Sequence, residues 1–182
     1  INNSFFGYFA GLTNTTGSQN AFFGKVAGRV NTTGLNNSFF GYAAGVSNTT
    51  GSTNSFFGTG SGASNTVGSN NTFLGYQAGY GNTDGLYNTY AGYEAGQMTT
   101  TGNANTFYGY QAGKANTVGD ANTVIGWNAN TSGIVSHATA IGAEAVVSTS
   151  NTIVLGRNFA NPSGSLGDDV VVYGFLRATL SP

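Results

Sequence analysis

Hydrophobic and polar positions recur along the chain in a fixed order with a period of 17 residues. Each unit begins with Asn and usually Ser or Thr, continues with two apolar, mostly aromatic residues and a glycine, and then follows the pattern Tyr-x-Ala-Gly before a polar stretch around Asn-Thr. The glycine after the aromatic pair returns at Gly7, Gly24, Gly41, Gly58, Gly75, Gly92, Gly109 and Gly126. Self-similarity at a fixed period indicates a repeat architecture, which here continues without insertion from residue 3 to about 127.

The length and chemistry of the unit favour β-structure. Seventeen residues are too few for a pair of helices, and the unit combines several glycines with no i, i+3, i+4 apolar pattern. We therefore predict an all-β fold, a parallel β-roll or β-solenoid with 17-residue coils stacked at the inter-strand spacing of ~4.8 Å. The run Asn-Ser-Phe-Phe-Gly-Tyr predicts one strand per coil, and the run around Asn-Thr-Thr predicts a second. Stacked amides should form a polar ladder, interrupted by Thr99. Its members are Asn14, Asn31, Asn48, Asn65, Asn82 and Asn116.

The two apolar positions of each strand should face opposite sides, because side chains alternate along a strand. One column would fill the narrow interior of the coil, and the other would form an outward apolar stripe too large for a soluble monomer. The stripe is therefore expected to be buried against other chains, although the pattern leaves open which column is which. The first column is Phe5, Phe22, Phe39, Phe56, Phe73, Tyr90 and Phe107, and the second is Phe6, Phe23, Phe40, Phe57, Leu74 and Tyr108, with Ala91 as a gap.

A further ring column follows the first glycine of the unit and is interrupted by Lys25 and Thr59. It fits packing at the rim of an inter-chain seam, or a ladder that stacks on sugar rings. The candidate binding residues are Tyr42, Tyr76, Tyr93, Tyr110 and Trp127. A column of threonines raises a third possibility, an ice-binding surface. It comprises Thr15, Thr32, Thr49, Thr66, Thr83, Thr100 and Thr117.

The composition argues against several other functions. The net charge is −1, with five basic and six acidic residues, so a basic surface for nucleic acid is ruled out. There is no cysteine, the single histidine is His137, and the carboxylates are scattered, so we expect no enzyme activity, no metal site and no cofactor. No apolar run approaches the ~18 residues of a membrane helix, so this segment is not expected to insert into a membrane.

After Gly126 the period shortens, with the next equivalent glycines at Gly142 and Gly156. Ala140-Ile141-Gly142 and the run 151–156, Asn-Thr-Ile-Val-Leu-Gly, resemble the head repeats of trimeric autotransporter adhesins. The 17-residue units, as in 71–79, resemble repeats of bacterial and phage tail-fibre proteins and of adhesive trimeric fibres of predatory bacteria. The resemblance implies a left-handed β-roll, three chains around one axis and a role in surface attachment. The bulky Phe pairs depart from the smaller residues of adhesin heads.

The expected organisation has three parts: 17-residue coils over 1–127, shorter adhesin-head-like coils over 128–156, and a cap, neck or start of the next fibre module over 157–182. Two strands are expected in the last part, around 168–174 and 175–180. The expected function is structural and adhesive. The chain would be a segment of a homotrimeric bacterial cell-surface or phage-type extracellular fibre, which contacts a host or prey cell-surface glycan or protein. The alternatives are a carbohydrate-binding tip that uses the aromatic ladder and an ice-binding solenoid.

Overall fold

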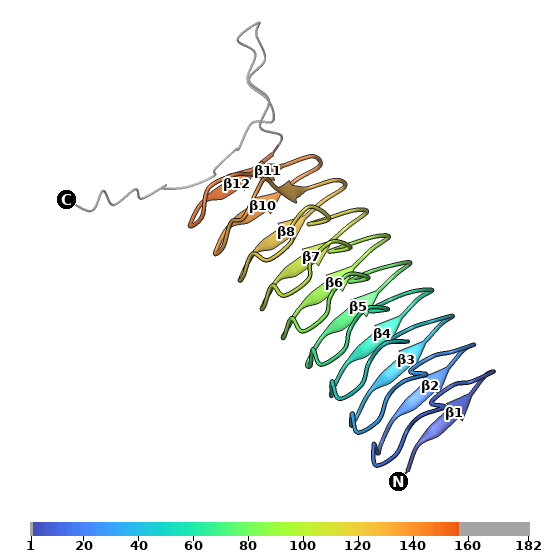
Figure 1. Cartoon of the computed structure of the whole chain (residues 1–182). Helices are drawn as coiled ribbons and strands as arrows, with labels where there is room; N and C mark the ends of the chain where they lie inside the picture. The colour runs from blue at the N-terminus through green and yellow to red at the C-terminus, as the bar shows by residue number, and fades with distance from the viewer. Residues whose placement is uncertain (1, 157–182) are drawn as a thin grey trace, which may run out of the picture.

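The computed structural model describes residues 2–156 as one stack of coils (Figure 1). Each coil contributes one three-residue strand to a ten-stranded parallel sheet, in which every strand pairs with the equivalent residues of the next coil, as Phe22 does with Phe39. The sheet follows the chain through β1 (Ser4–Phe6), β2 (Ala21–Phe23), β3 (Ser38–Phe40), β4 (Ser55–Phe57), β5 (Thr72–Leu74), β6 (Thr89–Ala91), β7 (Thr106–Tyr108), β8 (Thr123–Ile125), β10 (Thr139–Ile141) and β12 (Ile153–Leu155). The predicted all-β parallel solenoid with 17-residue coils is confirmed.

The second strand predicted in every coil is wrong for the 17-residue coils. There the Asn-Thr-Thr run forms a bend, in which one carbonyl accepts several N–H groups of the preceding coil. The backbone N–H groups of Thr15, Thr16 and Gly17 all donate to the carbonyl of Thr32, so no evenly spaced ladder can form. Within residues 2–156, a second strand occurs only where the coils shorten, as β9 (Asn130–Thr131) paired with β11 (Val146–Val147).

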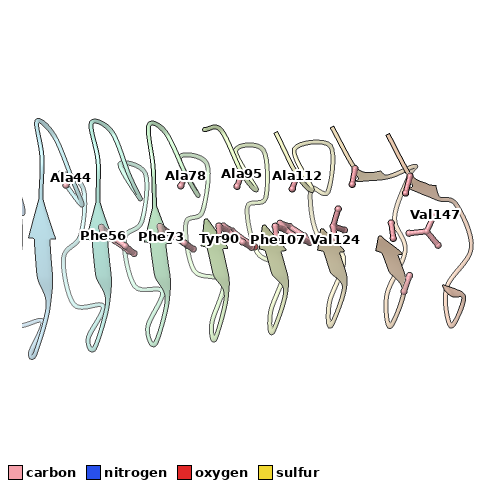
Figure 2. Packing of buried hydrophobic residues seen from close by; sticks show 14 of the residues in the cluster. Ala44, Phe56, Phe73, Ala78, Tyr90, Ala95, Phe107, Ala112, Val124 and Val147 are labelled. Atoms are coloured by element: carbon pink, nitrogen blue, oxygen red, sulfur yellow. The ribbon is translucent and has the colours of Figure 1, made fainter. Parts of the chain in front are cut away.

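The first aromatic column fills the interior of the solenoid, so the second column is the one that faces outward. Phe22, Phe39 and Phe56 are fully buried and stack face to face with their ring centroids 4.8 Å apart. A row of small residues, mostly alanines such as Ala44 and Ala78, packs opposite these rings (Figure 2). The rings fit because a glycine lies beside each one; a Cβ on Gly28 would collide with the ring of Phe22.

Two asparagine ladders satisfy most of the buried side-chain amides inside the solenoid. In the predicted ladder, Nδ2 of Asn48 donates to Oδ1 of Asn31 at 2.8 Å and to the carbonyl of Gly51 at 3.0 Å. A second ladder uses the first residue of each unit, where the backbone N–H of Asn37 donates to Oδ1 of Asn20 at 2.9 Å. Because buried amides left without partners are costly, these ladders also fix the register of one coil on the next.

The coil that contains β6 departs from the others at two interior positions. Tyr90 replaces a Phe of the inner column, and Thr99 replaces an Asn of the predicted ladder. The Thr99 hydroxyl donates to the carbonyl of Asn116 at 2.9 Å, and Oδ1 of Asn82 is left buried without a hydrogen bond. The Tyr90 hydroxyl is also buried without a hydrogen bond of good geometry. Burial raises the pKa of Tyr90, while the neighbouring Thr99 and Asn105 side chains lower it by a smaller amount. The shorter Thr99 side chain therefore compensates for the added phenol oxygen.

Restoring the common pair in this coil should stabilise the protein. We expect the double variant Tyr90→Phe/Thr99→Asn to raise the free energy of unfolding by about 2 kcal/mol, because two buried polar atoms no longer lack partners. Thr99→Asn alone should gain less, since the larger amide meets the Tyr90 hydroxyl. Urea unfolding of the parent chain, both single variants and the double variant measures this coupling. If the changes in unfolding free energy of the two single variants add up to that of the double variant, Thr99 does not compensate for the Tyr90 hydroxyl.

Candidate interaction surfaces

The outer face of the ten-stranded sheet carries an uninterrupted apolar row, which we name the outer stripe. It follows the second apolar column of the sequence through the whole sheet, and Phe6 and Tyr108 are 74% and 64% exposed. Phe23, Phe40 and Phe57 stack in parallel at 4.9 Å and 4.8 Å. The stripe consists of Phe6, Phe23, Phe40, Phe57, Leu74, Ala91, Tyr108, Ile125, Ile141 and Leu155. Nine steps of ~4.8 Å make it about 43 Å long.

Four of the five predicted binding residues form a continuous stack, which we name the aromatic ladder. Tyr76 stacks on Tyr93 at 5.0 Å, Tyr93 on Tyr110 at 5.2 Å, and Tyr110 on Trp127 at 6.4 Å between ring centroids. The fifth residue, Tyr42, lies outside the ladder because Thr59 occupies the coil between it and Tyr76. Neighbouring rings cover each other's faces, so the interior of the ladder offers mainly ring edges and phenol hydroxyls to a ligand.

A polar cluster beside the ladder was not foreseen from the sequence. Glu94 accepts hydrogen bonds from Nζ of Lys114 at 2.6 Å and from Nε2 of Gln111 at 2.8 Å. The bond from Lys114 is the main reason that the pKa of Glu94 lies below its ordinary value. Partial desolvation, followed by the charge of Glu94, raises the pKa of Tyr93. The sequence contains one indication of this contact. Glu94 and Gln111 are 17 residues apart, which places them at the same position in successive coils.

The threonine column considered for ice binding has its hydroxyls engaged within the protein. Thr32 Oγ1 donates to the carbonyl of Thr49 at 3.0 Å, and Thr49 Oγ1 donates to that of Thr66 at 3.0 Å. Thr15, Thr66, Thr83 and Thr100 make the same type of bond to the next coil. Most of these residues are only partly exposed. The column therefore stabilises the stack of coils and has few free donors for ordered water.

Other sequence predictions concern chemistry away from these surfaces. His137 lies exposed at the end of a coil, and residues 2–156 contain no cluster of three or more potential metal ligands. In that same part of the chain, no helix is long and apolar enough to cross a membrane. The strands predicted around 168–174 and 175–180 lie outside the described residues.

Comparison of the chain with protein-family models, curated proteins and solved structures gave no match. The proposed function therefore rests on the outer stripe and the aromatic ladder.

Proposed function

We propose that this chain is a segment of a homotrimeric fibre at a bacterial cell surface or of phage type, and that it acts in attachment. The observation that supports the proposal is the outer stripe, an apolar row that spans all ten strands of one sheet face. Soluble monomers rarely expose apolar patches of more than a few hundred Å². Sister chains with the same stripe are suitable partners, because equivalent coils offer the same ring at the same height.

Burial of the stripe would contribute favourable free energy to assembly. At ~25 cal/mol per Å², burying the exposed part of one phenylalanine ring contributes about 1–2 kcal/mol, and each chain contributes several such rings. Three chains packed around one axis would hide all three stripes and leave the aromatic ladders available. The left-handed sense of the coil, which the family resemblance implies, belongs to the same proposal.

The interior suits a load-bearing fibre segment. Backbone hydrogen bonds connect every 17-residue coil to the next, and two asparagine ladders and a stacked ring column reinforce most of these connections. Such a rod holds a contact surface away from the cell, and three copies of a weak site bind with avidity. The target is a host or prey cell-surface glycan or protein. The exposed ring edges and hydroxyls of the aromatic ladder favour a carbohydrate, whereas the engaged hydroxyls of the threonine column disfavour ice binding.

Adhesion of beads coated with the chain tests this function. We expect coated beads to be retained under flow on at least one member of a panel of bacterial and animal cells. Beads coated with a variant that cannot trimerise should be retained at least about tenfold less, because avidity is lost. Equal retention of coated and uncoated beads on every cell type would contradict the adhesive role.

A further inference from the structure

One coil lacks its ring in the column that forms the aromatic ladder. Residues 59–62 read Thr-Gly-Ser-Gly, where the neighbouring coils read Tyr-Ala-Ala-Gly and Tyr-Gln-Ala-Gly. Thr59 is exposed and carries no ring, and Gly60 carries no side chain next to it. The rings on either side are Tyr42 and Tyr76, both substantially exposed. The interruption therefore leaves a space in the column between two aromatic side chains.

The dimensions of this space follow from the coil spacing. One step of the column separates ring centroids by 5.0 Å where Tyr76 stacks on Tyr93, so Tyr42 and Tyr76, two steps apart, lie about 10 Å from each other. This separation leaves room for one further ring between Tyr42 and Tyr76. Within the described residues, neither Tyr42 nor Tyr76 stacks on a ring from the side of Thr59. The ring of Tyr76 is covered on its other side by Tyr93, and Nζ of Lys25 lies 6.0 Å from the ring centroid of Tyr42.

The side chains of Gln77 and Tyr80 line the side of this space that lies next to Gly60. A Cβ on Gly60 would lie 3.4 Å from Cγ of Gln77 and 3.6 Å from Cδ2 of Tyr80, so these two side chains occupy the space next to the glycine backbone. Ser61 is buried, and its hydroxyl donates to the carbonyl of Phe73 at 3.1 Å. The space between the rings, which we name the slot, therefore has the exposed side chains of Tyr42 and Tyr76 on either side and the exposed Thr59 between them.

We propose that the slot between Tyr42 and Tyr76 binds one pyranose ring of a neutral cell-surface glycan, with its ring substituents equatorial. This inference deepens the proposed attachment function, on which it rests, by naming the class of receptor and the place where it binds. In this proposal the binding site is the gap that the missing ring leaves at Thr59, and not the ladder of stacked rings.

The chemistry of the slot selects this ligand. A pyranose with equatorial substituents presents C–H groups on both faces, so it can lie between two aromatic rings, whose faces are electron-rich. Its hydroxyls then point outward around the edge, where the Thr59 hydroxyl and water can bond them. An axial hydroxyl would place an oxygen against one of the tyrosine faces. A nucleotide is disfavoured because Lys25 is the one cation described beside the slot, and the whole chain has only five basic residues.

Calorimetric titration with two tetrasaccharides tests the site. The probes are cellotetraose, whose β-linked glucose units have equatorial substituents, and β-1,4-galactotetraose, whose units carry an axial oxygen at C4. We expect the chain to bind cellotetraose at least about tenfold more tightly than galactotetraose. Thr59→Tyr, which fills the slot with the ring of the neighbouring coils, should abolish binding, and Tyr42→Ala should weaken it at least about tenfold.

Tyr87→Ala is the matched control, since Tyr87 is an exposed tyrosine outside the column and an alanine, Ala104, already occupies the equivalent position of the next coil with a similar φ. This variant should bind cellotetraose as the parent chain does. Stronger binding by Thr59→Tyr would overturn the slot in favour of the ladder, and loss of binding in Tyr87→Ala would overturn it as well. Absence of binding to cellotetraose, or tighter binding of a tyrosine-containing peptide that Thr59→Tyr blocks, would overturn the proposed sugar. Sedimentation of the same samples reports assembly separately, so failure of the slot and failure of the trimer are distinguishable.

Discussion

Replacing Gly41 with alanine should lower the free energy of unfolding by at least about 4 kcal/mol. A Cβ at this position would lie 2.5 Å from the carbonyl oxygen and 2.7 Å from the carbonyl carbon of Gly58 in the next coil. The backbone φ of Gly41 is +142°, which also disfavours any side chain. Because the obstacle is backbone, the two coils would have to separate and lose the pairing of β3 with β4 (Figure 1). Urea unfolding followed by circular dichroism measures the loss.

Gly133→Ala is the matched control for this effect. Gly133 also has a positive φ, +79°, but no atom lies within 4 Å of its Cβ position. The control therefore carries the conformational cost, about 1–2 kcal/mol, without the collision. Equal stability losses in the two variants would show that close approach of successive coils is not what requires glycine at position 41.

Replacing Phe40 with aspartate should prevent the proposed trimer from forming while leaving the single chain folded. Phe40 lies in the outer stripe, stacked between Phe23 and Phe57, and its side chain points away from the buried column. In the proposed assembly three aspartates would meet in an apolar seam, at a cost of about 3 kcal/mol or more per chain. Light scattering should then report a monomer or non-specific aggregates in place of three chains.

Thr50→Asp provides the control for added charge. Thr50 belongs to the same coil as Phe40 and is exposed, and the equivalent residue two coils later is already an aspartate, Asp84. This variant should keep the mass of the parent. A trimer that survives Phe40→Asp would mean that the outer stripe is not the seam between chains.

The sequence was sufficient to predict the coil because the period imposes it. A pair of apolar residues followed by Gly every 17 residues stacks on its own copies, and the Asn column implied the ladder that the structure contains, with Asn48 bonded to Asn31. The identity of the buried column was not predictable from alternation alone. It depends on the glycine column that makes room for rings, as Gly28 does for Phe22, and this contact spans six residues of an irregular turn.

The candidate site was harder to anticipate than the fold. The ring column was visible in the sequence, but its rings cover each other's faces, which only the stacking distances reveal. In the sequence Thr59 only interrupts the ring column, and the space that it leaves between Tyr42 and Tyr76 follows from the spacing of the coils. The prediction of a second strand in each coil was wrong for a related reason. Hydrogen bonding at Thr32 converges on one carbonyl, and residue propensities do not report such convergence.

Sedimentation equilibrium of the purified chain tests the central claim most directly. One chain has a mass of 18.5 kDa, and burial of the outer stripe by sister chains predicts a particle of three times that mass that persists on dilution to micromolar concentration. A monodisperse particle of 18.5 kDa over the whole concentration range would contradict it, because the exposed stripe would then be stable in water without a partner.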